Sequence, residues 1–152
     1  MKNVAVTVIV GFITGLVISG ILFDVIKYIG KSFNRVSVSW NISKAEKFYS
    51  NGRFSDSVLV YKNTLPKISS DNKLLTAKTK NNLALAILSK NDIMLLNNDN
   101  NSLKNDISNI SEIKEALELL NQANKLYIEI GNAELSAQTT KNIQLLNNII
   151  NN

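Results

Sequence analysis

The sequence contains no cysteine and no histidine in its 152 residues, and it has a single proline. Without these two residue types the chain cannot form a disulfide, a thiolate zinc site, a Ser-His or Cys-His catalytic pair, or a Glu-x-x-His di-iron site. Neither Gly-x-x-x-x-Gly-Lys nor Gly-x-Gly-x-x-Gly occurs, so nothing supports nucleotide binding. We therefore expect no enzyme activity, no metal, no cofactor and no small-molecule substrate.

Charges of opposite sign are unevenly distributed along the chain, whose formal net charge is +5. Residues 1–35 carry four basic and one acidic side chain (+3), and residues 36–152 carry thirteen and eleven (+2). Within the second part, residues 40–91 hold nine basic and three acidic groups (+6), whereas residues 92–152 hold four and eight (−4). A basic half suits anionic headgroups or an acidic partner. The lack of a recognisable module of interleaved aromatic and arginine residues argues against nucleic acid.

Residues 4–23, VAVTVIVGFITGLVISGILF, contain no charged side chain. A helix of this length spans about 30 Å, the thickness of a bilayer core. A cleaved signal peptide is the alternative, because Lys2 supplies a positive start, but the apolar run exceeds the usual length of about 7–15 residues. The stretch therefore predicts a retained transmembrane helix and a single-pass membrane protein.

Small residues recur every four positions in this stretch, at Thr7, Gly11, Gly15 and Ser19. Helical geometry places them on one stripe. Small side chains allow helices to approach closely in lipid, although they are common in membrane helices in general. Four of them in register favour packing against another transmembrane helix.

Basic and aromatic residues follow the apolar stretch. The basic ones lie within about 15 residues of it, where positive charge favours the cytoplasmic side. Because the short N-terminus with Lys2 favours the opposite orientation, both orientations stay open, and we prefer a cytoplasmic C-terminal domain. The residues predicted to lie at the membrane interface are Lys27, Tyr28, Lys31, Phe33, Arg35 and Trp40.

The rest of the chain has apolar residues at helical spacing and no competing strand pattern. The predicted helices cover residues 42–49, 55–68, 74–88, 109–130 and 135–150. Asn51-Gly52 and Gly131-Asn132 are expected to end helices, because glycine adopts positive φ at little cost. Ser55 stands where an N-cap belongs, and Asn109 with Glu112 is similar to a capping box. The sequence thus predicts an all-α fold with two domains: residues 1–35, and a helical domain over residues 36–152 with an insertion at about 92–110.

The residues around the first turn resemble a tetratricopeptide repeat, a pair of antiparallel helices with a glycine and an aromatic at the bend and small residues where the helices touch. The residues that carry this resemblance are Ala45, Gly52, Phe54, Ser57, Tyr61, Thr64 and Leu65. The spacing Ala116–Ala123 repeats the spacing Ser57–Thr64. Residues 81–88 resemble the first helix of another repeat, and residues 131–146 the start of a third repeat or a closing helix.

The sequence also departs from the pattern of this family. Trp40 stands one residue away from the family's tryptophan position, and a second repeat requires an insertion of about twenty residues between its helices, because Ala116 follows Ser57 by 59 positions. A helical bundle without repeats therefore remains the alternative.

The resemblance implies a partner-binding face formed by the first helix of each pair, with Tyr49 and Leu85 as exposed anchors. The residues of this predicted partner-binding face are Glu46, Tyr49, Lys78, Asn81, Leu85, Leu88, Gln138 and Lys141. The function expected is a membrane-anchored, non-catalytic adaptor, scaffold or assembly factor that binds protein partners. The alternative is an accessory subunit of a larger membrane complex, held through the small-residue stripe.

Two acidic patterns invite metal-binding hypotheses. Glu112, Glu115 and Glu118 recur every three residues, but acids in the first turns of a helix are favoured there by the helix dipole. The run NNDNNSLKND is similar to a calcium loop, yet Ser102 replaces the required glycine and Ser108 the bidentate glutamate. Neither pattern supports a metal site.

Overall fold

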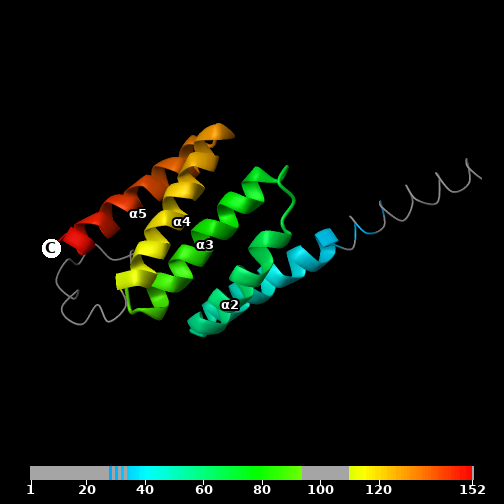
Figure 1. Ribbon diagram of the computed structural model, residues 1–152, viewed down its shortest axis with the longest axis horizontal. Helices are drawn as coiled ribbons and strands as arrows, with labels where there is room; N and C mark the ends of the chain where they lie inside the picture. Colours follow the sequence, from blue (N-terminus) through cyan, green and yellow to red (C-terminus); the bar gives the residue numbers. More distant parts are fainter. Residues whose placement is uncertain (1–27, 29, 31, 33, 94–109, 152) are drawn as a thin grey trace, which may run out of the picture. The chain divides into compact units, whose positions relative to one another are not determined.

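The computed structural model describes residues 28, 30, 32, 34–93 and 110–151. The chain divides into two compact units, residues 1–37 and 38–152. The helices of the second unit are residues 38–50, α2 (Phe54–Thr64), α3 (Lys73–Lys90), α4 (Ile110–Glu129) and α5 (Ala133–Asn151), with a short 3-10 helix, η1 (Leu65–Lys67), after α2 (Figure 1). Since all secondary structure within the described residues is helical, the all-α prediction is confirmed.

The predicted transmembrane segment, with Thr7, Gly11, Gly15 and Ser19, lies outside the described residues, as does most of the predicted insertion. Among the helices that are described, none combines the length and the apolar character needed to cross a bilayer. The physical reason is that these helices are interrupted by charge: lysines or glutamates recur along α3 and α4. This finding contradicts the predicted single-pass fold and the predicted membrane location with a cytoplasmic domain.

Two of the helix ends were predicted correctly from glycine. Gly52 and Gly131 both have φ of +71°, in the left-handed region. At the first turn, the Arg53 N–H donates to the Phe48 carbonyl at 2.8 Å and the Gly52 N–H to the Tyr49 carbonyl at 3.0 Å. The equivalent bonds at the second turn measure 2.9 and 3.0 Å. Each pair of bonds satisfies carbonyls that the helix end leaves without a partner.

The end of α3 uses the same motif without a glycine. Asp92 has φ of +58°, the Ile93 N–H donates to the Leu88 carbonyl at 2.9 Å, and the Asp92 N–H donates to the Ser89 carbonyl at 3.2 Å. Ile93 and Leu88 are buried in the same apolar cluster, which is the hydrophobic contact that often accompanies this motif. The sequence analysis did not identify this turn because an aspartate with positive φ is uncommon.

The helix starts differ from the prediction. The N-cap of α2 is Arg53, not Ser55, and its side chain makes no capping hydrogen bond; it pairs instead with Asp56 at 2.7 Å. Asparagines cap α3 and α5. Asn72 Oδ1 accepts from the Leu75 N–H, and Asn132 Oδ1 accepts from the Leu135 N–H, both at 3.1 Å. The predicted Asn109 cap lies outside the described residues.

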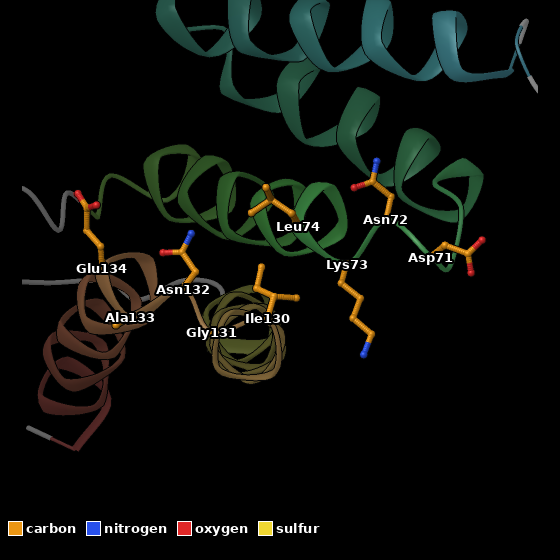
Figure 2. Close-up of a pocket in the computed structure, with 9 residues that line it drawn as sticks. All are labelled: Asp71, Asn72, Lys73, Leu74, Ile130, Gly131, Asn132, Ala133 and Glu134. Atoms are coloured by element: carbon orange, nitrogen blue, oxygen red, sulfur yellow. The ribbon is translucent and has the colours of Figure 1, made fainter.

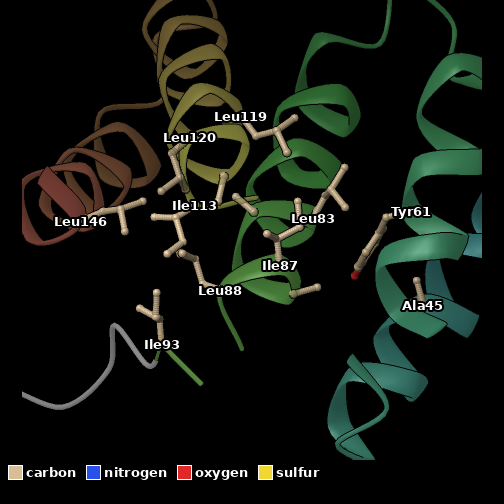
Figure 3. Packing of buried hydrophobic residues seen from close by; sticks show 13 residues of the cluster. Ala45, Tyr61, Leu83, Ile87, Leu88, Ile93, Ile113, Leu119, Leu120 and Leu146 are labelled. Atoms are coloured by element: carbon tan, nitrogen blue, oxygen red, sulfur yellow. The ribbon is translucent and has the colours of Figure 1, made fainter. Parts of the chain in front are cut away.

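The main core lies between α3 and α4, with α2 and α5 on either side (Figure 3). Its largest buried side chains are Tyr61, Leu83, Ile87, Leu88, Ile113, Leu120 and Leu146. Burial raises the pKa of Tyr61 to about 12, although a hydrogen bond with Asn82 opposes part of this shift.

Alanines let the helix backbones approach closely. The predicted contact between small residues is confirmed, because the Ser57 hydroxyl donates to the Ala45 carbonyl at 2.9 Å and both residues are fully buried.

The second unit repeats its own pattern of buried and capping residues. A shift of 59 positions relates three buried residues of α2 to three of α4: Ser57, Tyr61 and Thr64 to Ala116, Leu120 and Ala123. A shift of 60 positions relates the starts of α3 and α5: Asn72, Leu75, Ala77, Thr79, Asn82 and Leu85 recur as Asn132, Leu135, Ala137, Thr139, Asn142 and Leu145. The succession of α2 and α3 therefore recurs in α4 and α5 at these positions, although Ala77 is buried and Ala137 is exposed.

Candidate interaction surface

Ion pairs within the fold join the basic first part of the chain to its acidic second part. Lysines of α2 and α3 reach across to glutamates of α4 in three ion pairs: Lys62–Glu115 at 2.7 Å, Lys73–Glu129 at 3.1 Å and Lys90–Glu112 at 2.6 Å. Each pair is at least partly exposed, so each contributes little to stability by itself. Together they give a physical reason for a basic first half and an acidic second half that needs no external anion.

The three glutamates at the start of α4 have separate partners. Glu112 accepts hydrogen bonds from Lys90 and, at 2.9 Å, from the Asn91 side chain, and these bonds lower its carboxyl pKa below the usual 4.5. Glu115 pairs with Lys62, and Glu118 accepts from the Gln122 amide at 2.8 Å. They do not converge on one point, and within the described ranges no group of three acidic side chains is placed to hold a metal ion.

The predicted partner-binding face begins where residues 38–50 lie beside α3. The Tyr49 hydroxyl is 3.0 Å from the Ser89 hydroxyl, and the Tyr49 ring packs edge-on against Phe54, with centroids 5.3 Å apart. Tyr49 is therefore half-buried, not the freely exposed anchor that the sequence predicted. Leu85 lies one helical turn before Ser89 and is also half-buried, so an aromatic and an aliphatic side chain are partly exposed near this seam.

The other residues of the predicted face separate into three groups. Glu46 and Lys78 are exposed, and Asn81 is half-buried, so these three remain available to a partner. Leu88 is only 1% exposed and belongs to the core, so its assignment to the face is wrong. Gln138 and Lys141 are exposed on α5, which packs on α4 rather than on α3.

The residues assigned to a membrane interface do not form a described site. Tyr28 and Trp40 are 74% and 63% exposed, and Arg35 is exposed as well. Trp40 has the Lys44 ammonium 5.3 Å from its ring, a contact that the sequence analysis did not foresee. Lys27, Lys31 and Phe33 lie outside the described residues.

A depression of about 690 Å³ lies where α3 and α5 begin, lined by residues 71–74 and 130–134. Figure 2 shows Leu74 and Ile130 on facing elements of this depression, and they are 40% and 37% exposed. The capping residues Asn72 and Asn132 lie beside them. Asp71, Lys73 and Glu134 also line the depression, so it presents polar and apolar surface in equal measure.

A second depression, of about 410 Å³, lies where η1, α3 and α4 meet. Its lining residues are Leu65, Pro66, Ile68, Ser70, Lys73, Thr76, Lys80 and Leu126. The Lys80 ammonium donates to Gln122 Oε1 at 2.6 Å. Neither depression could be predicted from the sequence, because each joins segments more than forty residues apart.

Comparisons of the chain with models of known families, with curated proteins and with solved structures give no match.

Proposed function

We propose that the helical unit, residues 38–152, is a non-catalytic protein-interaction module built as a tetratricopeptide-like array. The observation that carries this proposal is the shift of 59–60 positions, which relates three buried residues of α2 to three of α4, and the capping asparagine and a buried threonine of α3 to those of α5. A repeat unit of this kind cannot bury its apolar face alone, so stacked copies share one continuous core. Helices that recur in this way present a continuous surface on one side, which suits the binding of an extended or helical polypeptide segment.

In this proposal the antiparallel hairpins are residues 38–50 with α2 and α3 with α4, and α5 begins the next. The binding side consists of the first helix of each, that is residues 38–50, α3 and α5. Its centre combines Tyr49 and Leu85, and Glu46, Lys78 and Asn81 supply charge and hydrogen-bonding groups around them. Partly exposed aromatic and aliphatic anchors within a polar rim are the usual composition of a protein-binding site. The module therefore takes protein partners, and the proposal assigns it no substrate, cofactor or nucleic acid.

The exposed residues of α5 fit a closing position in the array. Gln144, Asn147 and Asn148 are exposed, whereas Leu146 is fully buried against the core. A terminal helix of a stacked array needs a polar outer face, because no further repeat covers it. α5 therefore has the polar outer face that is expected of a closing helix.

The test is site-specific photo-crosslinking in cells. A photoreactive phenylalanine analogue replaces Asn81 or Gln138 on the proposed binding side, and Asn63 or Lys114, exposed on α2 and α4, in matched controls. We expect adducts with the same protein partner from the first two positions and none from the controls. No adducts from Asn81 and Gln138, or equal adducts from all four positions, would overturn the proposed function.

A further inference from the structure

The second depression, which we call the Lys80 groove, has apolar walls and two lysines at its edges. Leu65, Pro66 and Ile68 come from η1 and the segment after it, and Leu126 comes from α4. Its volume of about 410 Å³ lies within the range of ordinary ligand-binding pockets. Thr76 and Ser70 add hydroxyl groups to a surface that is otherwise aliphatic.

Lys80 differs from the other lysines that reach toward α4. Lys62, Lys73 and Lys90 each end on a glutamate carboxylate. The half-buried Lys80 ends on the neutral amide oxygen of Gln122, and no carboxylate within the described residues lies within 4 Å of it. The nearest acid in this network is Glu118, which Lys80 reaches only through the Gln122 amide. The ammonium charge at the groove is therefore incompletely compensated.

The net charge of the lining residues indicates the charge of an occupant. Lys73 is already paired with Glu129, so the groove retains about one positive charge, on Lys80. A single lysine ammonium is a compact point charge that matches one carboxylate, whereas a phosphate dianion is better matched by an arginine fork or several cations. The aliphatic walls favour an apolar group next to that carboxylate.

We propose that the Lys80 groove is a second docking site, which binds a peptide segment of a protein partner through an acidic side chain that pairs with Lys80 and an adjacent apolar side chain that packs against Ile68 and Leu126. On binding, the carboxylate replaces the Gln122 amide as the partner of Lys80. The exchange replaces a hydrogen bond from the ammonium to a neutral oxygen with an ion pair to a carboxylate, in a partly desolvated site where charged interactions are stronger.

This site is distinct from the predicted partner-binding face. At 100° per residue, Lys73, Thr76 and Lys80 lie on one side of α3, and Lys78, Asn81 and Leu85 lie about a third of a turn away. The two surfaces can therefore be occupied independently, and the inference goes beyond the proposed function. A variant that abolishes binding at one surface should leave binding at the other surface unchanged. Variants of the two surfaces therefore distinguish the two proposals.

The experiment selects peptides from a random library displayed on phage, using the full-length chain as bait. We expect sequences enriched in an acidic residue next to a large aliphatic residue. Synthetic versions of the enriched peptides are then measured by fluorescence anisotropy against the parent chain and the variants K80Q and Q122E. In Q122E the new carboxylate neutralises Lys80 within the fold, so both variants should weaken binding by about tenfold or more.

The matched control is K62Q, which removes a lysine that also reaches a residue of α4 but comes from a different helix and does not line the groove. This variant should bind the peptides as the parent chain does, and thermal unfolding of all variants shows whether they are folded. Q122E should melt no lower than the parent, which separates loss of binding from loss of structure. Selection without acidic enrichment, or binding that survives both K80Q and Q122E, overturns the inference. If the peptides instead lose binding to L85D, they occupy the predicted partner-binding face. That result also overturns this inference, while it supports the proposed function.

Discussion

The hydroxyl of Tyr49 lies 3.0 Å from the hydroxyl of Ser89, forty residues further along the chain. The bond joins residues 38–50 to α3. Tyr49 is one of the two proposed anchors of the binding side, and the other, Leu85, lies one helical turn before Ser89. We expect Tyr49→Phe to lower the free energy of unfolding by about 1 kcal/mol, the usual net value of a hydrogen bond. Urea unfolding followed by circular dichroism measures this loss.

A double-mutant cycle tests whether the loss belongs to this pair. Ser89→Ala should cost a similar amount, and the double variant should cost less than the sum of the two single changes, because the bond is lost only once. Tyr28→Phe is the control, since Tyr28 is largely exposed and its change should leave stability unaltered. Additive losses in the cycle would show that the two hydroxyls do not interact.

The left-handed residue at the end of α3 gives a second prediction. Asp92 holds φ of +58° without being glycine, and a side chain in this region costs about 1 kcal/mol. Asp92→Gly should therefore stabilise the fold by up to that amount, while Gly52→Ala and Gly131→Ala should each destabilise it. A Cβ at either glycine would meet no atom within 4 Å, so the loss has a backbone origin and not a steric one. A neutral or destabilising Asp92→Gly would contradict this account.

Two equivalent threonines give a third prediction. Thr79 and Thr139 are both buried, but the Thr139 hydroxyl donates to the Leu135 carbonyl at 2.8 Å, whereas the Thr79 hydroxyl has no hydrogen-bond partner. Burying an unpaired hydroxyl costs about 1–3 kcal/mol. Thr79→Val should therefore raise the free energy of unfolding by about 1 kcal/mol, and Thr139→Val should not. Equal effects at the two positions, measured by urea unfolding, would rule out the difference in hydrogen bonding as the cause.

The parts of the fold that depend on neighbouring residues could be predicted from the sequence. Gly52 and Gly131 were identified because the left-handed region favours glycine. The Ala45–Ser57 contact was expected because the repeat that these residues resemble places small residues where its helices touch. Ser55 was misassigned because a good capping side chain two residues too late cannot be distinguished from one in the right place. Helix ends are generally uncertain by a residue or two.

The faces of α3 could not be predicted, because three neighbouring helices surround it. Residues 38–50, α2 and α4 all contact α3, so its apolar residues do not form one stripe. Spacing alone placed Leu88 on the predicted partner-binding face, although it points into the core. A helix covered on several sides loses the amphipathic pattern from which a face can be assigned.

Contacts distant in sequence were also beyond prediction. The ion pairs between α4 and the two preceding helices join residues 22 to 56 positions apart. The family's usual period is 34, whereas Ser57 and Ala116 are 59 positions apart and the starts of α3 and α5 are 60 apart, because α3 is long and a further segment separates it from α4. A longer helix keeps the local spacing of its apolar residues. It increases, however, the number of positions that separate equivalent residues in successive repeats.

The lowered carboxyl pKa of Glu112 predicts how stability depends on pH. The folded-state pKa lies below the usual 4.5, so on acidification the unfolded chain binds a proton first. Stability is therefore fully present above 4.5 and falls as the pH drops through the folded-state value. Urea unfolding between pH 7 and about pH 3 should show a shallower acid loss in Glu112→Gln and also in Lys90→Gln, which removes the main cause of the shift. An acid loss unchanged in both variants would place the titrating group elsewhere.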